Sequence, residues 1–215
     1  GQHRGHSIYL GFGGNLKKLA LEFSGNKDGC TYGMGGSLGI HSEKINMYGH
    51  DGFMGSNVCI GVGASFITKK PTIIFMGDAA FEEDYVLASV SWVAKKKIPV
   101  LIVVEDNNFA ITTSKKERRD WSVKNISKAF GIESFDVKDD PMQIYKVLKE
   151  YDFKKPRLIN IHTNRLFWHA GAGIDDPKTF DRLKIEKKKL GESGEKTYQK
   201  AKNKIDKIFR ELNVF

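Results

Sequence analysis

Two oxygen-bearing side chains, Asp78 and Asn107, each follow an uninterrupted apolar run, at residues 72–76 and 100–104. Short apolar runs of this kind predict buried parallel strands, and ligands bind beyond the carboxyl ends of such strands. A carboxylate, an amide oxygen and a nearby backbone carbonyl suit Mg²⁺, which takes its remaining ligands from water and phosphate. The pair therefore predicts a magnesium–diphosphate site. Taken singly, Asp78 is better explained as a helix N-cap and Asn107 as a turn residue.

The elements that must position this pair follow from hydrophobic periodicity. Apolar runs predict strands at residues 72–76, 100–104 and 157–161, and helical spacing predicts helices at 16–23, 56–68, 81–97, 125–130 and 142–151. Strands that alternate with helices predict an α/β fold, with a mostly parallel sheet flanked by helices. The tail, residues 177–212, reads as two charged amphipathic helices broken near residues 191–194.

Composition narrows the class of protein. The chain has 215 residues, 40% of them hydrophobic, which fits one large domain or a domain with an appendage. The net charge is +9, but the basic residues alternate with acidic ones, as over residues 184–204, so solvated helix faces are expected rather than a nucleic-acid surface. Cys30 and Cys59 form no disulfide or metal pattern, which favours a reduced, cytoplasmic compartment.

Neither a membrane-spanning segment nor a signal peptide is expected. No apolar run has the length of a membrane span, and the sequence opens at Gly1 without a signal peptide. The abrupt start suggests that an upstream segment is missing.

Residues 1–57 are rich in glycine, at 11–14, 33–36 and 49–52, which predicts loops whose backbone can approach a ligand closely.

The order of these motifs resembles a known family. Gly77-Asp78, a helix and then Asn107 is similar to the thiamine diphosphate motif of transketolase-like and 2-oxo-acid dehydrogenase enzymes. The similarity sharpens to the alpha subunits of the pyruvate, branched-chain 2-oxo-acid and acetoin dehydrogenases. It runs from residue 3 to 114 and more loosely to 177, and its motifs lie at residues 4–6, 33–37, 49–55 and 105–114. The resemblance implies a thiamine diphosphate-binding domain over residues 1–176 and a helical extension over 177–215.

The resemblance assigns roles at the diphosphate end of the cofactor. It implies Mg²⁺ ligation by Asp78, Asn107 and the carbonyl of Phe109, with Asn108 as the alternative amide. The positions that match diphosphate-binding residues are His3, Arg4, Gly77, Ala79 and Ala80. Ala79 and Asp84 stand where the family usually has glycine. An alanine still presents its N–H if its φ is negative, so a small effect is expected at Ala79.

The resemblance also assigns the remainder of the cofactor. The backbones of Gly52 and Met54 match the positions that hold the aminopyrimidine ring. Ile111 matches the apolar residue that supports the bent cofactor, although core packing is an alternative. His169, four residues after Arg165, matches a histidine near the reacting carbon and is the expected catalytic residue.

Other positions in these segments differ from the family or carry weaker expectations. Ala170 replaces a serine that is phosphorylated in some relatives, and residues 171–173 form an insert. Substrate-side roles are open for four further histidines, His3, His6, His41 and His50.

The implied activity is oxidative decarboxylation of a 2-oxo acid, with acyl transfer to a lipoyl component. The essential glutamate belongs to a beta subunit in this family, so half an active site is expected here, in an assembly of two alpha and two beta chains. A split transketolase-like enzyme, an acyloin-forming enzyme and a non-catalytic cofactor-binding subunit are the alternatives. No nucleic acid or membrane partner is expected.

Overall fold

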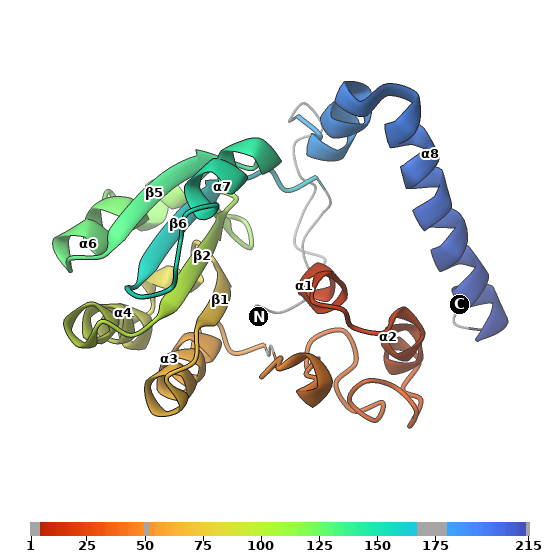
Figure 1. Cartoon of the computed structure of the whole chain (residues 1–215), viewed down its shortest axis with the longest axis horizontal. Helices are drawn as coiled ribbons and strands as arrows, with labels where there is room; N and C mark the ends of the chain where they lie inside the picture. Colours follow the sequence, from red (N-terminus) through yellow and green to blue (C-terminus); the bar gives the residue numbers. More distant parts are fainter. Residues whose placement is uncertain (1–4, 50–51, 167–179, 214–215) are drawn as a thin grey trace. The chain divides into compact units, whose positions relative to one another are not determined.

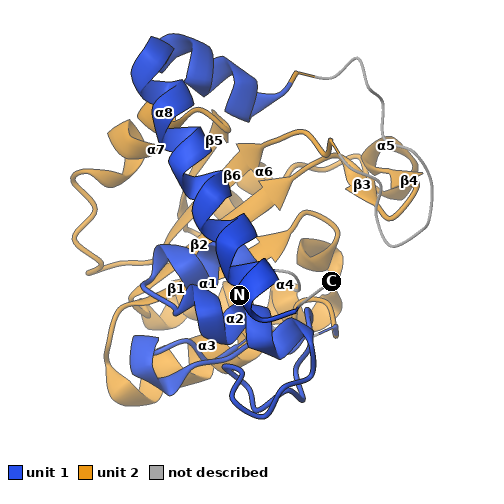
Figure 2. Ribbon diagram, turned by 90° about the vertical axis from the view of Figure 1, so that its right-hand side faces the viewer, with its two compact units in different colours: residues 1–52, 181–215 blue, residues 53–180 orange. Residues whose placement is uncertain are grey.

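The computed structural model describes residues 5–49, 52–166 and 180–213. The chain divides into two compact units, shown in Figure 2: unit 1 is Gly1–Gly52 with Asp181–Phe215, and unit 2 is Phe53–Phe180. Residues 1–52, which we predicted to share a domain with the strands, thus group with the C-terminal helix. The functional division at residue 176 stays a prediction.

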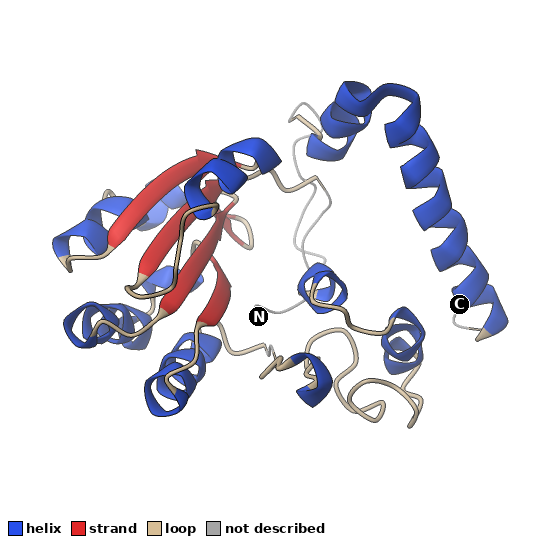
Figure 3. Cartoon of the chain, in the orientation of Figure 1, coloured by secondary structure: helices blue, strands red, loops and turns tan. Residues whose placement is uncertain are grey.

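Unit 2 is built on a four-stranded parallel sheet in the order β1-β2-β6-β5 (Figure 3). The strands are β1 Thr72–Gly77, β2 Val100–Asp106, β5 Glu133–Lys138 and β6 Arg157–His162. The helices are α3 Ser56–Thr68, α4 Asp84–Lys96, α6 Val123–Ala129 and α7 Pro141–Leu148, with a short 3-10 helix η2 at Ala80–Glu82. The predicted α/β fold and its three strands are confirmed, whereas β5 was not predicted.

Helices cover the two faces of this sheet unequally, as Figure 1 shows. On one face, β1 and β2 side chains such as Met76 and Ile102 pack with apolar residues of α3, α4 and α6. On the other face, Leu101, Val103 and Ile159 pack with Ile144 and other residues around α7. The central strand β2 has apolar residues buried on both faces, which explains its uninterrupted apolar run.

A hairpin and a single helical turn follow the central strand. Strands β3 Phe109–Ala110 and β4 Thr113–Ser114 pair antiparallel, and α5 Lys115–Arg118 comes directly after them. The Glu117 carboxylate accepts hydrogen bonds from the Ser114 N–H at 2.9 Å and from its hydroxyl at 2.8 Å. These bonds fix the start of α5.

Unit 1 contains α1 His6–Gly11, α2 Leu16–Phe23, the 3-10 helix η1 Glu43–Ile45 and α8 Arg182–Glu211. Tyr9, Leu19 and Ile40 form its small core. Gly191 interrupts α8 with φ 58° and ψ −137°, which confirms the predicted break in the tail. In the described ranges, no helix is both long and apolar enough to cross a bilayer.

Candidate functional site

Asp78 directly follows β1 and lies beside the central strand. Its N–H donates to the Glu105 carbonyl at 3.2 Å, which extends the register in which Gly77 pairs with Glu105. The residue is 1% exposed, and Arg118 Nη2 donates to its Oδ2 at 2.7 Å. Burial raises the pKa of Asp78, and the hydrogen bond from Arg118 only partly offsets this effect. Asp78 is therefore a desolvated carboxylate with a cation beside it.

Arg118 belongs to a compact group of two carboxylates and two guanidinium groups. It also forms an ion pair with Glu82, whose Oε1 accepts a 2.7 Å hydrogen bond from Arg119 Nε. Arg119 stacks on the Trp121 ring, 4.4 Å from its centroid, and donates to the Trp121 carbonyl at 2.6 Å. The formal charges of Asp78, Glu82, Arg118 and Arg119 cancel, which is the condition for burying them together.

A second aspartate, Asp106, ends the central strand and has its own cation. Lys115 Nζ lies 2.8 Å from its Oδ2, and Asn160 Nδ2 donates to the same oxygen at 3.3 Å. Burial alone would raise the pKa of Asp106, but the hydrogen bond and charge of Lys115 bring the net pKa below its usual range. Lys115 and Arg118 are three residues apart on α5, so this one turn supplies a cation to each strand-end aspartate.

The predicted amide ligand lies just beyond Asp106. Asn107 Oδ1 accepts a hydrogen bond from the Phe109 N–H at 3.0 Å, which leaves the oxygen a second lone pair. Asn108, the alternative ligand, is exposed and left-handed, with φ 71°. Ligation by Asn107, Asn108 or the Phe109 carbonyl stays a prediction.

Ile111 occupies an unusual place in the hairpin loop. Its φ is 53° and its side chain is 55% exposed, so core packing does not explain this residue. A β-branched residue rarely adopts positive φ, at a cost of about 1–3 kcal/mol, and such strain gathers at functional sites. Arg165 donates to the Ile111 carbonyl at 2.7 Å and lies 5.2 Å from the Phe109 ring centroid, so it braces the loop.

Four further positions predicted to contact the diphosphate or the pyrimidine lie in described parts of the chain near α3 and η2. Ala79 has φ −69°, as its expected role requires, and Ala80 begins η2. The Met54 carbonyl accepts a hydrogen bond from the Tyr85 hydroxyl. Gly52 is exposed and belongs to unit 1. These roles stay predictions.

The predicted histidines are divided between the described and undescribed parts of the chain. His6 lies on α1, with Nε2 3.0 Å from the Ser37 carbonyl, and His41 is exposed. Both belong to unit 1. The other predicted positions lie outside the described residues: His3, Arg4, His50, His169, Ala170 and residues 171–173.

Sequence reasoning missed one buried carboxylate, Glu22 on α2. It is 0% exposed, and its two oxygens accept backbone N–H bonds from the glycine-rich loop. The donors are Thr31 at 2.6 Å, Gly33 at 3.0 Å, Gly35 at 2.7 Å and Gly36 at 3.2 Å. An acidic residue in the last turn of an amphipathic helix, just before a glycine-rich run, was the available signal.

The donor set at the strand ends fits a hard cation. Asp78, Asn107 and the Phe109 carbonyl offer only oxygen, as Mg²⁺ prefers. The Arg118 guanidinium now pairs with Asp78 and would compete with the metal. No group of three His, Cys, Asp or Glu side chains suited to a metal occurs in the described ranges. A metal held here would therefore depend on further oxygen ligands such as phosphate.

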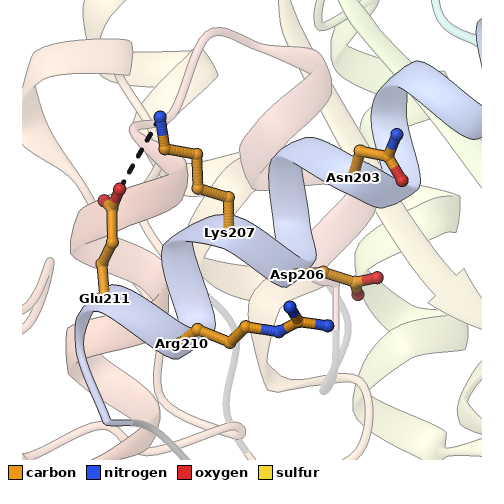
Figure 4. Close-up of a pocket in the computed structure, with 5 residues that line it drawn as sticks. All are labelled: Asn203, Asp206, Lys207, Arg210 and Glu211. Carbon is orange, nitrogen blue, oxygen red and sulfur yellow. Dashed lines mark ion pairs between the residues drawn. The ribbon is translucent and has the colours of Figure 1, made fainter.

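A hollow on α8 is a weaker candidate. It is lined by Asn203, Asp206, Lys207, Arg210 and Glu211, all from one helix (Figure 4). Lys207 and Glu211 pair across it at 3.8 Å in the ordinary i,i+4 geometry of a helix surface. This arrangement is a solvated helix face.

Comparison with known proteins identifies the family of the chain. The family model described as dehydrogenase E1 component matches residues 1–206, which is most of the chain. The chain belongs to the dehydrogenase E1 component family. Membership in this family implies thiamine diphosphate as the cofactor.

This E1 chain is also similar to individual proteins that are named as alpha subunits of the pyruvate dehydrogenase E1 component. It is 25% identical over 198 residues to the mitochondrial pyruvate dehydrogenase E1 component subunit alpha of Solanum tuberosum, covering 86% of this chain and 49% of that protein. It is 28% identical over 204 residues to the corresponding subunit of Rhizobium meliloti, covering 87% and 56%. It is 30% identical over 198 residues to subunit alpha-1 of Oryza sativa subsp. japonica, covering 86% and 49%. The E1 chain spans about half the length of the curated relatives it matches.

Proposed function

We propose that this E1 chain is the alpha-type half of a thiamine diphosphate-dependent 2-oxo-acid dehydrogenase that oxidatively decarboxylates a 2-oxo acid and passes the acyl group to a lipoyl component. The observation that carries the proposal is the nearly fully buried Asp78 at the end of β1, beside the central strand that leads to Asn107. The E1 family match and the pyruvate dehydrogenase relatives support the choice of reaction.

The residues of the chain would bind and orient the cofactor. Asp78, Asn107 and the Phe109 carbonyl would hold Mg²⁺, and Gly77, Ala79 and Ala80 would border the diphosphate together with His3 and Arg4. Ile111 would support the cofactor where its two rings meet, because its side chain is exposed in a braced loop. The backbones of Gly52 and Met54 would contact the pyrimidine.

When bound, thiamine diphosphate supplies the electron sink for decarboxylation. His169 would act close to the reacting atoms, as donor or acceptor of a proton at the substrate. A beta subunit would supply the glutamate that activates the pyrimidine, in an assembly of two alpha and two beta chains in the cytoplasm.

Two measurements test this proposal. Calorimetry with thiamine diphosphate should show binding in the presence of Mg²⁺ and the beta subunit, and absence of heat under these conditions would refute the cofactor site. Release of labelled carbon dioxide from a 2-oxo acid, coupled to acylation of a lipoyl domain, should follow for the reconstituted pair. Carboligation without lipoyl acylation would instead assign an acyloin-forming enzyme.

A further inference from the structure

Arg118 already pairs with Asp78, the predicted metal ligand. Its Nη2 donates to Asp78 Oδ2 at 2.7 Å, and its side chain is only 11% exposed. Two cations beside one buried carboxylate repel each other strongly, because solvent screens them poorly. Mg²⁺ and Arg118 therefore compete for Asp78.

Glu82 gives Arg118 a second carboxylate partner. Arg118 Nη1 pairs with Glu82 while Nη2 pairs with Asp78, so the guanidinium group bridges the two carboxylates. Arg118 Nε is buried and has no hydrogen-bond partner among the described residues. The bridge thus leaves one donor unsatisfied, at a cost that a small shift of the guanidinium could remove.

Lys115 provides an internal comparison on the same helical turn. It pairs with Asp106 at 2.8 Å, and Asp106 also accepts hydrogen bonds from Asn160 and from the Asn108 N–H. Asp106 is not a predicted metal ligand. A metal at Asp78 would therefore displace Arg118 and leave the Lys115 pair in place.

We propose that Arg118 is an exchangeable counter-ion that holds Asp78 until Mg²⁺ arrives and then remains on Glu82 alone. Arg118 is thereby a positioning residue that sets the metal affinity of the site. This inference rests on the proposed function, because it takes Asp78 as a metal ligand. The exchange keeps Asp78 neutralised by a cation in both states.

The test is the affinity of the full chain for Mn²⁺ in the presence of thiamine diphosphate and the beta subunit, followed by the electron paramagnetic resonance signal of the free ion. Arg118→Gln removes the competing cation, so Mn²⁺ should bind about tenfold more tightly, the equivalent of one charge-assisted hydrogen bond. Glu82→Gln leaves Arg118 with Asp78 as its sole carboxylate partner, so Mn²⁺ should bind several-fold more weakly. Lys116→Gln, an exposed control on α5, should change the affinity by less than about twofold, since a solvated charge is well screened.

The opposite signs keep the test informative if a variant is damaged, because misfolding weakens binding in every case. Unchanged or weaker Mn²⁺ binding by Arg118→Gln, with a wild-type chain that binds Mn²⁺, would overturn the exchange and leave the metal site standing. Absence of Mn²⁺ binding by the wild-type chain in the presence of thiamine diphosphate and the beta subunit would remove the metal site and the proposed function together.

Discussion

Two buried carboxylates, one in each unit, are neutralised in different ways. Glu22 is 0% exposed and accepts four backbone N–H bonds, whereas Asp78 is 1% exposed and is paired with the Arg118 side chain. Backbone donors are fixed by the path of the loop and have no substitute. A long side chain can swing away and be replaced by a metal ion. The first arrangement suits a permanent structural contact and the second suits a ligand site.

The two regions also obtain left-handed backbone differently. The glycine-rich loop uses Gly25, Gly33 and Gly36 at positive φ, with Tyr32 as an exception, and a Cβ at Gly33 would clash with the Gly25 carbonyl. The loop after β2 places Ile111 in the same conformation, at a cost in strain. The glycine-rich loop avoids backbone strain at these positions, whereas the loop after β2 accepts the strain and keeps an exposed apolar side chain.

The largest effect is expected at Glu22. Glu22→Gln replaces an acceptor oxygen with an NH₂ group that faces N–H donors, so the free energy of unfolding should fall by about 3 kcal/mol. Urea denaturation measures this loss. Glu43→Gln, an exposed control in the same unit, should stay within about 0.5 kcal/mol of the wild type. A loss below about 1 kcal/mol at Glu22 would contradict its role as the fixed contact.

Asp78→Asn tests whether the second carboxylate of the comparison binds a metal. The neutral amide has lost the charge that attracts Mg²⁺, so thiamine diphosphate should bind at least about 100-fold more weakly in its presence. Calorimetry on the complex with the beta subunit gives the affinity. Asp84→Asn, an exposed change nearby on α4, serves as the control and should shift the affinity less than about twofold. Equal affinities in the two variants would exclude Asp78 as a ligand.

Substitution of Lys115 is expected to lower the free energy of unfolding by a smaller, pH-dependent amount. The pKa of Asp106 is lowered in the folded chain, so its pairing stabilises the fold above the ordinary aspartate pKa and is lost as the pH falls through the lower folded value. Lys115→Gln should cost about 1–2 kcal/mol at pH 7, a value reduced for the partial exposure of Lys115, and clearly less near pH 3. Urea denaturation at both pH values checks the sign. A stability difference between the wild type and Lys115→Gln that is larger at pH 3 than at pH 7 would contradict the expected sign.

The smallest expected effect separates strain from ligand contact. Ile111→Gly should raise the free energy of unfolding by about 1 kcal/mol, since glycine adopts positive φ without strain, and should weaken cofactor binding about tenfold. Thermal unfolding and calorimetry provide the two readouts. Thr112→Gly is the matched control, because Thr112 is not among the positive-φ residues and should only lose stability. A stabilised Ile111→Gly chain with unchanged cofactor affinity would leave the strain without a function.

Much of unit 2 could be predicted because its central strands are buried on both faces. Strand β5 was missed because its buried positions, Ser134 and Val137, lie among exposed polar ones, so no apolar run marks it. Asp78 and Asn107 could be proposed as site residues because each follows an apolar run that predicts a buried strand. Arg118 and Glu82 were missed because their contacts join residues about 40 positions apart, and adjacent arginines in a charged segment resemble a solvated surface.

The Glu22 contact has a consequence for how the glycine-rich loop opens. Four donors between Thr31 and Gly36 meet on one side chain, so the loop cannot release them one at a time without leaving buried charge unsatisfied. Its local unfolding is therefore a single cooperative event. A protease added to the folded chain should cut this loop only while it is locally unfolded. The cleavage rate therefore reports how often the hydrogen bonds to Glu22 break.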